Sequence, residues 1–198
     1  MAILRFIREA KDSSLLSLGL VEGEESARYT VSARIFLEIG SPTVGDVLDN
    51  SQMSAIEYAD KLYRAEKKAL SILSFADNNY RTLKQKLGRA GFDSEIAGEI
   101  CDKMVSLGYI NETRQLERLV LVEANTKLRG PGRIVPALVA KGYSLSDVKS
   151  VTMDLIERGE IDFKENAKKL LAKKLRITGS PFLVTRRVAA LSYSPDAT

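Results

Sequence analysis

The spacing of hydrophobic positions changes near residue 50. Before it, residues 3–7 form a short apolar run, and residues 29–36 are rich in β-branched and aromatic side chains with partial alternation. Both patterns are typical of strands. The acidic, glycine-containing stretch 22–25 predicts a turn or hairpin before the second run, and glycine and proline break the chain between residues 40 and 45. We therefore predict a small β-rich extension over residues 1–50.

After residue 50, apolar residues recur at the three- to four-residue spacing of amphipathic helices. Residues 51–87 contain neither proline nor glycine. This stretch therefore predicts either one long helix or two helices joined near residues 77–79.

A repeat of about 50 residues organises the rest of the chain. Residues 87–93, which read Leu-Gly-Arg-Ala-Gly-Phe-Asp, return 51 positions later as residues 138–144, and a third copy begins at Val188. A second landmark, residues 107–111, returns as residues 158–162 with the same offset. The repeat predicts one structural unit that is used several times.

These landmarks have the chemistry of helix ends. Gly91 and Gly142 stand where a helix stops and a positive φ is favourable, and an aromatic residue follows each of them. Asp93, Ser144 and Ser194 then occupy N-cap positions of the next helix. In the second landmark, further glycines at residues 108 and 159 end that helix.

Each repeat thus predicts three helices, and the predicted fold class is mainly α: tandem three-helix repeats with a small N-terminal β-element. A linking helix and the first repeat are expected over residues 51–111, the second repeat over 112–162, and a third, incomplete at its C-terminal end, over 163–198. Repeated units stack face to face, so we expect an elongated, curved body that suits an extended partner.

Composition narrows the chemistry. The 198 residues include no histidine and one cysteine, Cys101, which excludes a Ser-His-Asp triad, a Cys-His pair, a His-ligated zinc site and an intrachain disulfide. Cys101 has apolar helical neighbours and is expected in the core. No run of 18 apolar residues and no secretory signal is evident. We predict a cytoplasmic protein that is not an enzyme and needs no metal or cofactor.

Charge is unevenly distributed. Residues 1–60 carry 5 basic and 10 acidic residues, residues 61–198 carry 25 and 16, and residues 163–198 alone carry 8 and 2. Basic segments attract phosphate backbones or acidic protein surfaces. A solvated, solubilising surface is the competing interpretation.

The candidate contact residues share a positive charge and a position on or beside a repeat helix. They are Lys84, Lys86, Arg89, Arg129, Arg133, Lys168, Lys169, Lys173, Lys174, Arg186 and Arg187. Two of them flank a Gly-Pro-Gly sequence that lacks the preceding strand and the Gly-Lys-Ser/Thr of a phosphate-binding loop, so an inter-helix turn is the alternative there. The lysine-rich helix lacks interleaved aromatic residues, so its sequence does not indicate base stacking.

The order of these segments resembles the RecX family, bacterial regulators of the recombinase RecA. The resemblance covers about residues 65–194. It rests on the leucine-rich stretch 69–73, Lys86-Leu87, Gly91-Phe92, Gly-Tyr-Ile-Asn-Glu at 108–112, Gly132-Arg133-Ile134, Leu138 with Gly142-Tyr143, and the lysine-rich opening of the third repeat. Glu112 stands where the family usually has Asp, Thr82-Leu83 replaces Glu-Leu, and Ser192 replaces a third glycine. The β-element resembles an extension that some members carry.

The resemblance implies a non-catalytic modulator with roles in DNA repair, recombination and the SOS response. Such a protein binds RecA and its nucleoprotein filament and commonly inhibits ATP hydrolysis, strand exchange and co-protease activity. The expected partner is the RecA filament, with single- or double-stranded DNA as a further partner, and we expect a monomer that does not contact membranes. The alternative is a direct DNA-binding protein built from tandem helix-turn-helix-like units.

Overall fold

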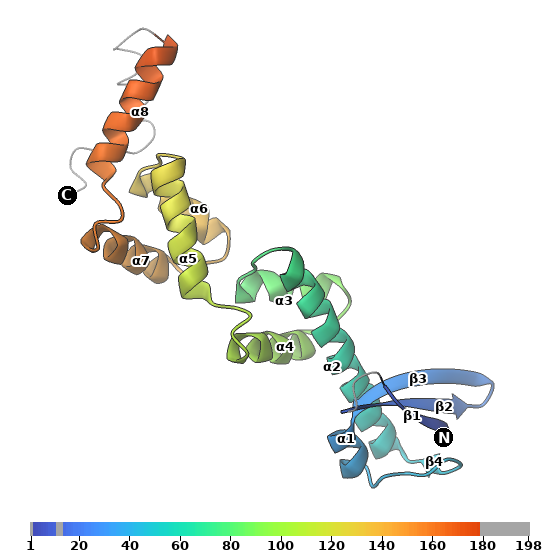
Figure 1. Ribbon diagram of the computed structural model, residues 1–198. Helices are drawn as coiled ribbons and strands as arrows, with labels where there is room; N and C mark the ends of the chain where they lie inside the picture. The colour runs from blue at the N-terminus through green and yellow to red at the C-terminus, as the bar shows by residue number, and fades with distance from the viewer. Residues whose placement is uncertain (1, 11–13, 179–198) are drawn as a thin grey trace. The chain divides into compact units, whose positions relative to one another are not determined.

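The computed structural model describes residues 2–10 and 14–178 (Figure 1). It confirms the predicted class, because helices follow a small N-terminal sheet. The elements are β1 (Ala2–Glu9), β2 (Leu15–Glu22), β3 (Glu25–Ser32), α1 (Ala33–Glu38), β4 (Val47–Leu48), α2 (Asn50–Phe75), α3 (Tyr80–Arg89), α4 (Ser94–Ser106), α5 (Glu112–Leu121), the π-helix η1 (Val122–Thr126), α6 (Pro131–Ala140), α7 (Leu145–Glu157) and α8 (Phe163–Thr178).

Contacts divide the described chain into two compact units. The first contains the sheet, α1, α2 and residues 83–106. The second contains residues 77–82 and the chain from Leu107 onward.

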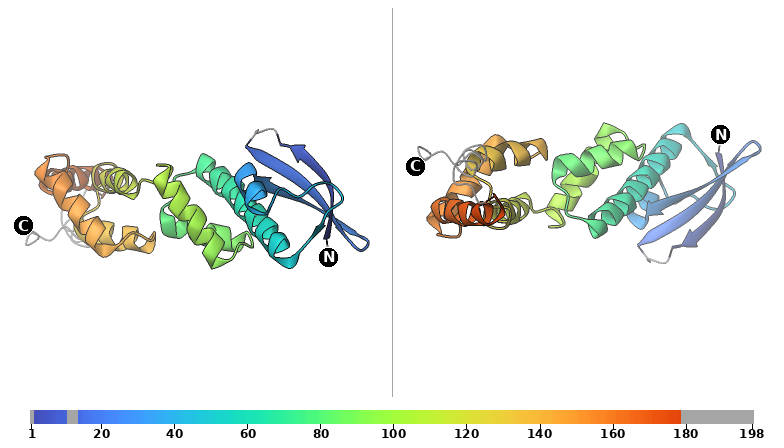
Figure 2. Two further views of the ribbon diagram at one scale, coloured as in Figure 1. Left: turned by 90° about the horizontal axis from the view of Figure 1, so that it is seen from below. Right: turned by 90° about the horizontal axis from the view of Figure 1, so that it is seen from above.

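The sheet of the first unit is antiparallel, with strand order β3-β2-β1-β4. Its inner face contributes Leu4, Leu18 and Leu20 to a core that Ile56 of α2 completes. Figure 2 shows α2 running along the sheet. Asp60 of α2, which is 5% exposed, accepts the backbone N–H of Thr30 at 2.8 Å and fixes the edge strand β3 to the helix.

Two details of the predicted β-element need correction. The strand expected over residues 29–36 stops at Ser32, because the Ser32 hydroxyl accepts the N–H of Ile35 at 3.3 Å and caps α1. The strand β2 lies where the spacing predicted none. Its core-facing leucines share one side of the sheet, and the turn predicted at residues 22–25 connects it to β3.

The stretch after residue 50 forms two helices, α2 and α3, which are joined near residues 77–79. This confirms the second of the two alternatives that the sequence allowed. A capping box between Asp49 and Gln52 begins α2. The helix ends at Ala76, whose backbone is extended. Asn79 then accepts the N–H of Thr82 at 2.8 Å, which supports the first turn of α3.

The repeated helix ends are the same at the level of single hydrogen bonds. Gly91 and Gly142 have φ of 94° and 98°. The backbone N–H of the aromatic residue after each glycine donates to the carbonyl of a buried leucine in the preceding helix. Phe92 donates to the Leu87 carbonyl at 3.2 Å, and Tyr143 donates to the Leu138 carbonyl at 3.3 Å. Both are Schellman-type bonds that satisfy the last carbonyls of a helix.

The predicted caps are confirmed in both repeats. Asp93 accepts the N–H of Ile96 at 2.9 Å, and Ser144 accepts that of Asp147 at 3.0 Å. The glycines of the second landmark, at residues 108 and 159, have φ of 75° and 73°. In the third repeat the structure describes α8, whereas Val188 and Ser194 lie outside the described residues.

Candidate interaction surface

The first group of candidate basic residues lies on α3. Leu83 and Leu87 are fully buried and define the inner face of this helix. Because each residue turns an α-helix by about 100°, Lys84 and Lys86 flank the buried face on opposite sides, and the exposed Arg89 lies on the outer side between them. The three charges therefore surround the solvent-facing arc of α3 and do not form one row.

The single cysteine lies on the next helix, where the charge of Lys84 on α3 acts on its thiol. Cys101 of α4 is fully buried. Burial raises the pKa of its thiol to about 11, although the positive charge of Lys84 acts in the opposite direction. A thiol with this pKa is protonated at neutral pH and is a poor nucleophile. The predicted core position of Cys101 is confirmed.

Arg129 of the second unit is held by a buried carboxylate. Glu123 of η1 is 2% exposed and accepts from both Lys127 and Arg129 at 2.6 Å. Burial alone would raise the pKa of Glu123, but these two cations lower it below its ordinary value. The Arg129 backbone N–H also donates to the Glu123 carbonyl at 3.0 Å. We call Glu123, Lys127 and Arg129 the Glu123 cluster.

The glycine-rich sequence that follows the Glu123 cluster begins α6. Gly130 caps α6, and Pro131 stands in its first turn, a favourable position for proline. The segment is therefore a turn between η1 and α6, and anion contact by Arg129 and Arg133 stays a prediction. Arg133 is exposed on the first turn of α6.

The lysines of α8 form two exposed rows. Lys164 and Lys168 are one turn apart on one side, and Lys169 and Lys173 are one turn apart on the other. Glu165 is the acidic residue beside them, with its carboxylate 3.7 Å from the Lys168 ammonium. The structure places the backbone of Lys174 in α8 but does not describe its side chain, and Arg186 and Arg187 lie outside the described residues.

The base of α8 is anchored to the second unit. The Asn166 side chain is 4% exposed and donates to the Ala124 carbonyl at 3.2 Å and to the Asn125 side chain at 2.9 Å. Leu170 is buried one turn later. These contacts orient the inner side of α8 and leave the two lysine rows outside.

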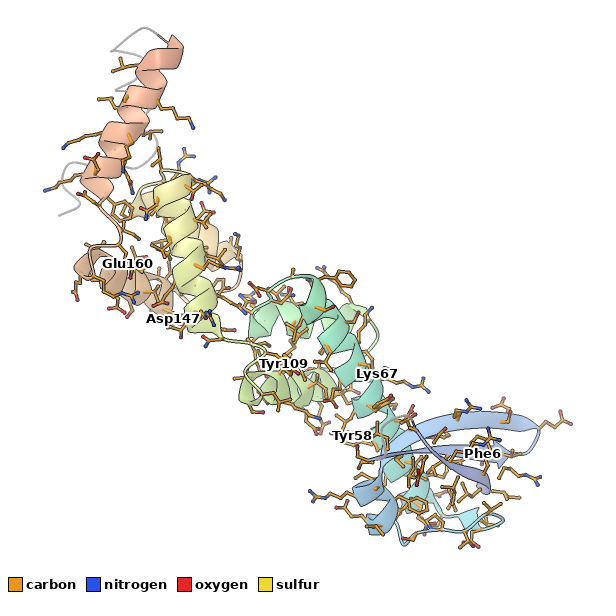
Figure 3. All side chains as sticks on the ribbon, viewed as in Figure 1. Phe6, Tyr58, Lys67, Tyr109, Asp147 and Glu160 are labelled. Carbon is orange, nitrogen blue, oxygen red and sulfur yellow. The ribbon has the colours of Figure 1, made fainter. Side chains whose placement is uncertain are left out.

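One further surface of the second unit was missed by the sequence analysis. A hollow of about 360 Å³ at the start of α5 is lined by Tyr109, Arg114, Arg118 and Asp77, among others. Tyr109 is 56% exposed (Figure 3), and Arg118 forms an ion pair with Asp77. The four-residue spacing of the two arginines, next to the Gly-Tyr landmark, was the available signal.

Within residues 2–10 and 14–178, no group of three or more Cys, Asp and Glu residues could hold a metal ion. None of the helices in this part of the chain is both long and apolar enough to cross a bilayer. The chemistry that the described surface offers is charge, hydrogen bonding and a few exposed aromatic rings.

Comparison with known proteins places this chain in a family. No profile of a known protein family matches the chain. The regulatory protein RecX of Stenotrophomonas maltophilia is 31% identical over 124 residues, which are 63% of this chain and 73% of that protein. The chain belongs to the RecX family. The regulatory protein RecX of Listeria welshimeri is 25% identical over 132 residues, 67% of this chain. This match spans about half, 48%, of the Listeria protein.

Solved structures of the RecX family share the fold. A crystal structure of regulatory protein RecX has a TM-score of 0.74 at 24% identity and covers 98% of this chain and 95% of its own. The crystal structure of RecX from Lactobacillus salivarius has a TM-score of 0.60 at 22% identity and covers 70% and 92%. At these identities the structural likeness concerns the fold alone.

Proposed function

We propose that this RecX-family protein binds RecA and its nucleoprotein filament and inhibits ATP hydrolysis, strand exchange and co-protease activity. Family membership carries the proposal. The relatives are named regulatory proteins, and the name RecX ties that regulation to RecA. We further propose that the protein acts as a cytoplasmic monomer.

The lysine rows of α8 are the proposed main contact. Lys168, Lys169 and Lys173 are exposed on a helix whose opposite side is anchored, so the fold does not need their charges. A rigid helix carrying charge along one exposed arc suits the acidic surface of a protein groove or a phosphate backbone. The arc of α3 around Arg89 is the proposed second contact, and Arg133 is a weaker candidate. Arg129 contributes least, because the Glu123 cluster already holds its charge.

The first experiment measures ATP hydrolysis by the cognate RecA on single-stranded DNA, with and without this protein. Inhibition well below one molecule per recombinase would support capping or destabilising filaments at a few points. Inhibition only near equimolar ratios would support coating of the filament groove or competition for DNA. Unchanged hydrolysis with filaments present would contradict the proposal.

Charge reversal on α8 tests the surface. We expect Lys168→Glu, Lys169→Glu and Lys173→Glu together to abolish inhibition. The matched control reverses Lys61, Lys68 and Lys149, which are also exposed and lie outside the proposed surface. Exposed substitutions change the free energy of unfolding by about 0.5 kcal/mol or less each, so both variants should fold. Equal inhibition by the two triple variants would remove α8 from the mechanism.

The second candidate function is direct DNA binding, which the exposed Arg89 of α3 and the exposed lysines of α8 favour. It predicts affinity for bare DNA that falls linearly with the logarithm of salt concentration, in proportion to the number of phosphates neutralised. Tight binding to RecA together with negligible affinity for bare DNA near physiological salt would exclude it.

A further inference from the structure

The outer face of the N-terminal sheet carries an aromatic ring in an unusual position. Phe6 of β1 lies opposite Gly19 of β2, and its ring fills the space above that glycine. A Cβ atom at Gly19 would lie 2.1 Å from the Phe6 ring, so no other residue is compatible with this arrangement. The ring is therefore seated on the sheet by a glycine and stands on the face away from the core.

Two arginines converge on the same ring. Arg8 belongs to β1, two residues after Phe6, and its guanidinium lies 4.9 Å from the ring centroid. Arg28 of β3 pairs with Gly19 in the strand register, and its guanidinium lies 5.5 Å from the centroid. Both distances are in the range of cation–π contacts. Neither arginine has a salt-bridge partner among the described residues.

This arrangement concentrates positive charge in an acidic part of the chain. Residues 1–60 carry 10 acidic and 5 basic residues, yet Arg8 and Arg28 share one spot on the sheet. Two guanidiniums that have no salt-bridge partner among residues 2–10 and 14–178, beside a seated aromatic ring, form a site for a ligand that combines negative charge with a flat, stackable surface.

We propose that Phe6, Arg8 and Arg28 form a binding site for single-stranded nucleic acid on the outer face of the sheet. Aromatic side chains on exposed sheets stack unpaired bases, and arginines beside them hold phosphates or stack on the next base. The guanidiniums swing from the ring to the phosphates while the base takes their place over Phe6. A duplex does not fit this chemistry, because its bases are already stacked and paired.

The acidic tip of the β2–β3 hairpin determines in which direction a bound strand would leave the site. Glu22 pairs with Glu25 at the end of the β2–β3 hairpin, three positions from the Gly19–Arg28 pair. Strands rise about 3.3 Å per residue, so the tip is about 10 Å from the site. The phosphate backbone should therefore leave Phe6 away from the hairpin tip. Neutralising Glu24 and Glu25 should tighten binding.

The absence of tryptophan from the sequence allows a direct test of stacking. The variant Phe6→Trp introduces a single tryptophan, which can be excited selectively over the tyrosines, at the site of the full-length protein. We expect titration with an oligo-dT strand to quench its fluorescence strongly, because thymine stacks on the indole. The control is Phe75→Trp, at a position that is 88% exposed on α2. Absence of quenching in Phe6→Trp, or equal quenching in both variants, overturns the proposal.

A second measurement separates bases from phosphates. Anisotropy titrations compare a labelled oligo-dT strand with an abasic strand of the same length. Wild type should bind oligo-dT about tenfold more tightly, in line with the usual contribution of one stacked base. Phe6→Leu, which keeps an apolar cover over Gly19, should remove that difference. A difference that persists in Phe6→Leu overturns the stacking role.

Charge removal tests the arginines. Arg8→Gln with Arg28→Gln should lower the salt slope of oligo-dT binding by about 1.4, since each phosphate contact with a single strand contributes about 0.7. The matched control, Arg34→Gln with Lys61→Gln, removes the same charge from exposed positions of the same unit. Equal slopes in the two double variants overturn the site. The probe contains no RecA, so this result is independent of the function proposed above.

Discussion

The two three-helix repeats share the hydrogen bonds at their helix ends and differ in their surfaces. In the first, α3 presents Lys84, Lys86 and Arg89. The corresponding positions of α6, 51 residues later, hold Val135, Ala137 and Ala140. The glycine, aromatic and cap residues of the two repeats nevertheless make the same bonds within 0.1 Å.

The comparison separates what builds the repeat from what it presents to a partner. Helix ends must satisfy their unpaired backbone groups, and only a few residue types do so. Exposed positions carry no such requirement and are free to change. The second repeat has also acquired a feature of its own, because Glu123 corresponds to Ile72 in the first repeat. The Glu123 cluster thus gives the two repeats different electrostatics beneath similar backbones.

The largest expected effect tests whether the repeats are equivalent in their cores. Leu87 and Leu138 are corresponding residues with no exposed area. Replacing either by alanine should lower the free energy of unfolding by about 3 kcal/mol, because it removes apolar contacts and leaves a cavity. Hydrogen exchange should localise the loss to α3–α4 for Leu87→Ala and to α6–α7 for Leu138→Ala. A loss spread over both repeats in either variant would contradict separate cores.

The next effect concerns the glycines at the helix ends. Both Gly91→Ala and Gly142→Ala place a Cβ in a left-handed conformation, at a cost of about 1 kcal/mol. At Gly142 the new atom would also lie 3.2 Å from Arg81 and 3.3 Å from Asn79, whereas Gly91 has open space. We expect Gly142→Ala to cost about 1 kcal/mol more in denaturant unfolding. Equal costs would show that Arg81 and Asn79 adjust freely.

Solution pH should affect the repeats in opposite directions. The pKa of Glu123 is lowered in the folded state, so its contribution is complete above the ordinary value of 4.5 and declines as pH falls below it. The pKa of Cys101 is raised from 9.0 to about 11, so its contribution is complete below pH 9 and declines as pH rises towards 11, by about 2 kcal/mol.

Two variants check this pH dependence. Glu123→Gln should flatten the acid limb of unfolding for the second repeat, and Cys101→Ala should flatten the alkaline limb for the first. Hydrogen exchange at matched pH, corrected for intrinsic rates, assigns each limb to its repeat. Acid sensitivity that persists unchanged in Glu123→Gln would assign it to other carboxylates.

The smallest effect on stability comes from exchanging surface charge between the repeats. Arg89→Ala and Ala140→Arg alter corresponding exposed positions. Each should change the free energy of unfolding by about 0.5 kcal/mol or less. Arg89→Ala should weaken inhibition of RecA if α3 is a contact, and Ala140→Arg serves as the matched charge change on α6. Identical inhibition by both variants and wild type would remove α3 from the proposed surface.

Much of the helical architecture followed from local chemistry. Gly91 and Gly142 adopt a positive φ, and the side chains of Asp93 and Ser144 accept a hydrogen bond from a later backbone N–H. The residues that meet these requirements recur 51 positions apart in the sequence. For the stretch that forms α2 and α3, the local pattern left two alternatives, one continuous helix or two helices joined by a break. The predicted end of the strand over residues 29–36 was wrong, because the β-branched composition did not reveal that Ser32 caps a helix.

The surfaces depended on contacts between distant residues. Arg129 was predicted as a contact residue from its positive charge and its place in the sequence. Only the fold shows that the buried Glu123 lies beside it and offsets that charge. Tyr109 and Arg118 meet Asp77 through tertiary packing.

The sequence by itself determined the class of fold, the positions of the helix ends and the charge available to a partner, because each depends on neighbouring residues. Tertiary structure alone decided which charges are already paired. It also decided that Phe6, Arg8 and Arg28 meet on one face of a sheet, because strand register joins residues that lie about 20 positions apart in the chain.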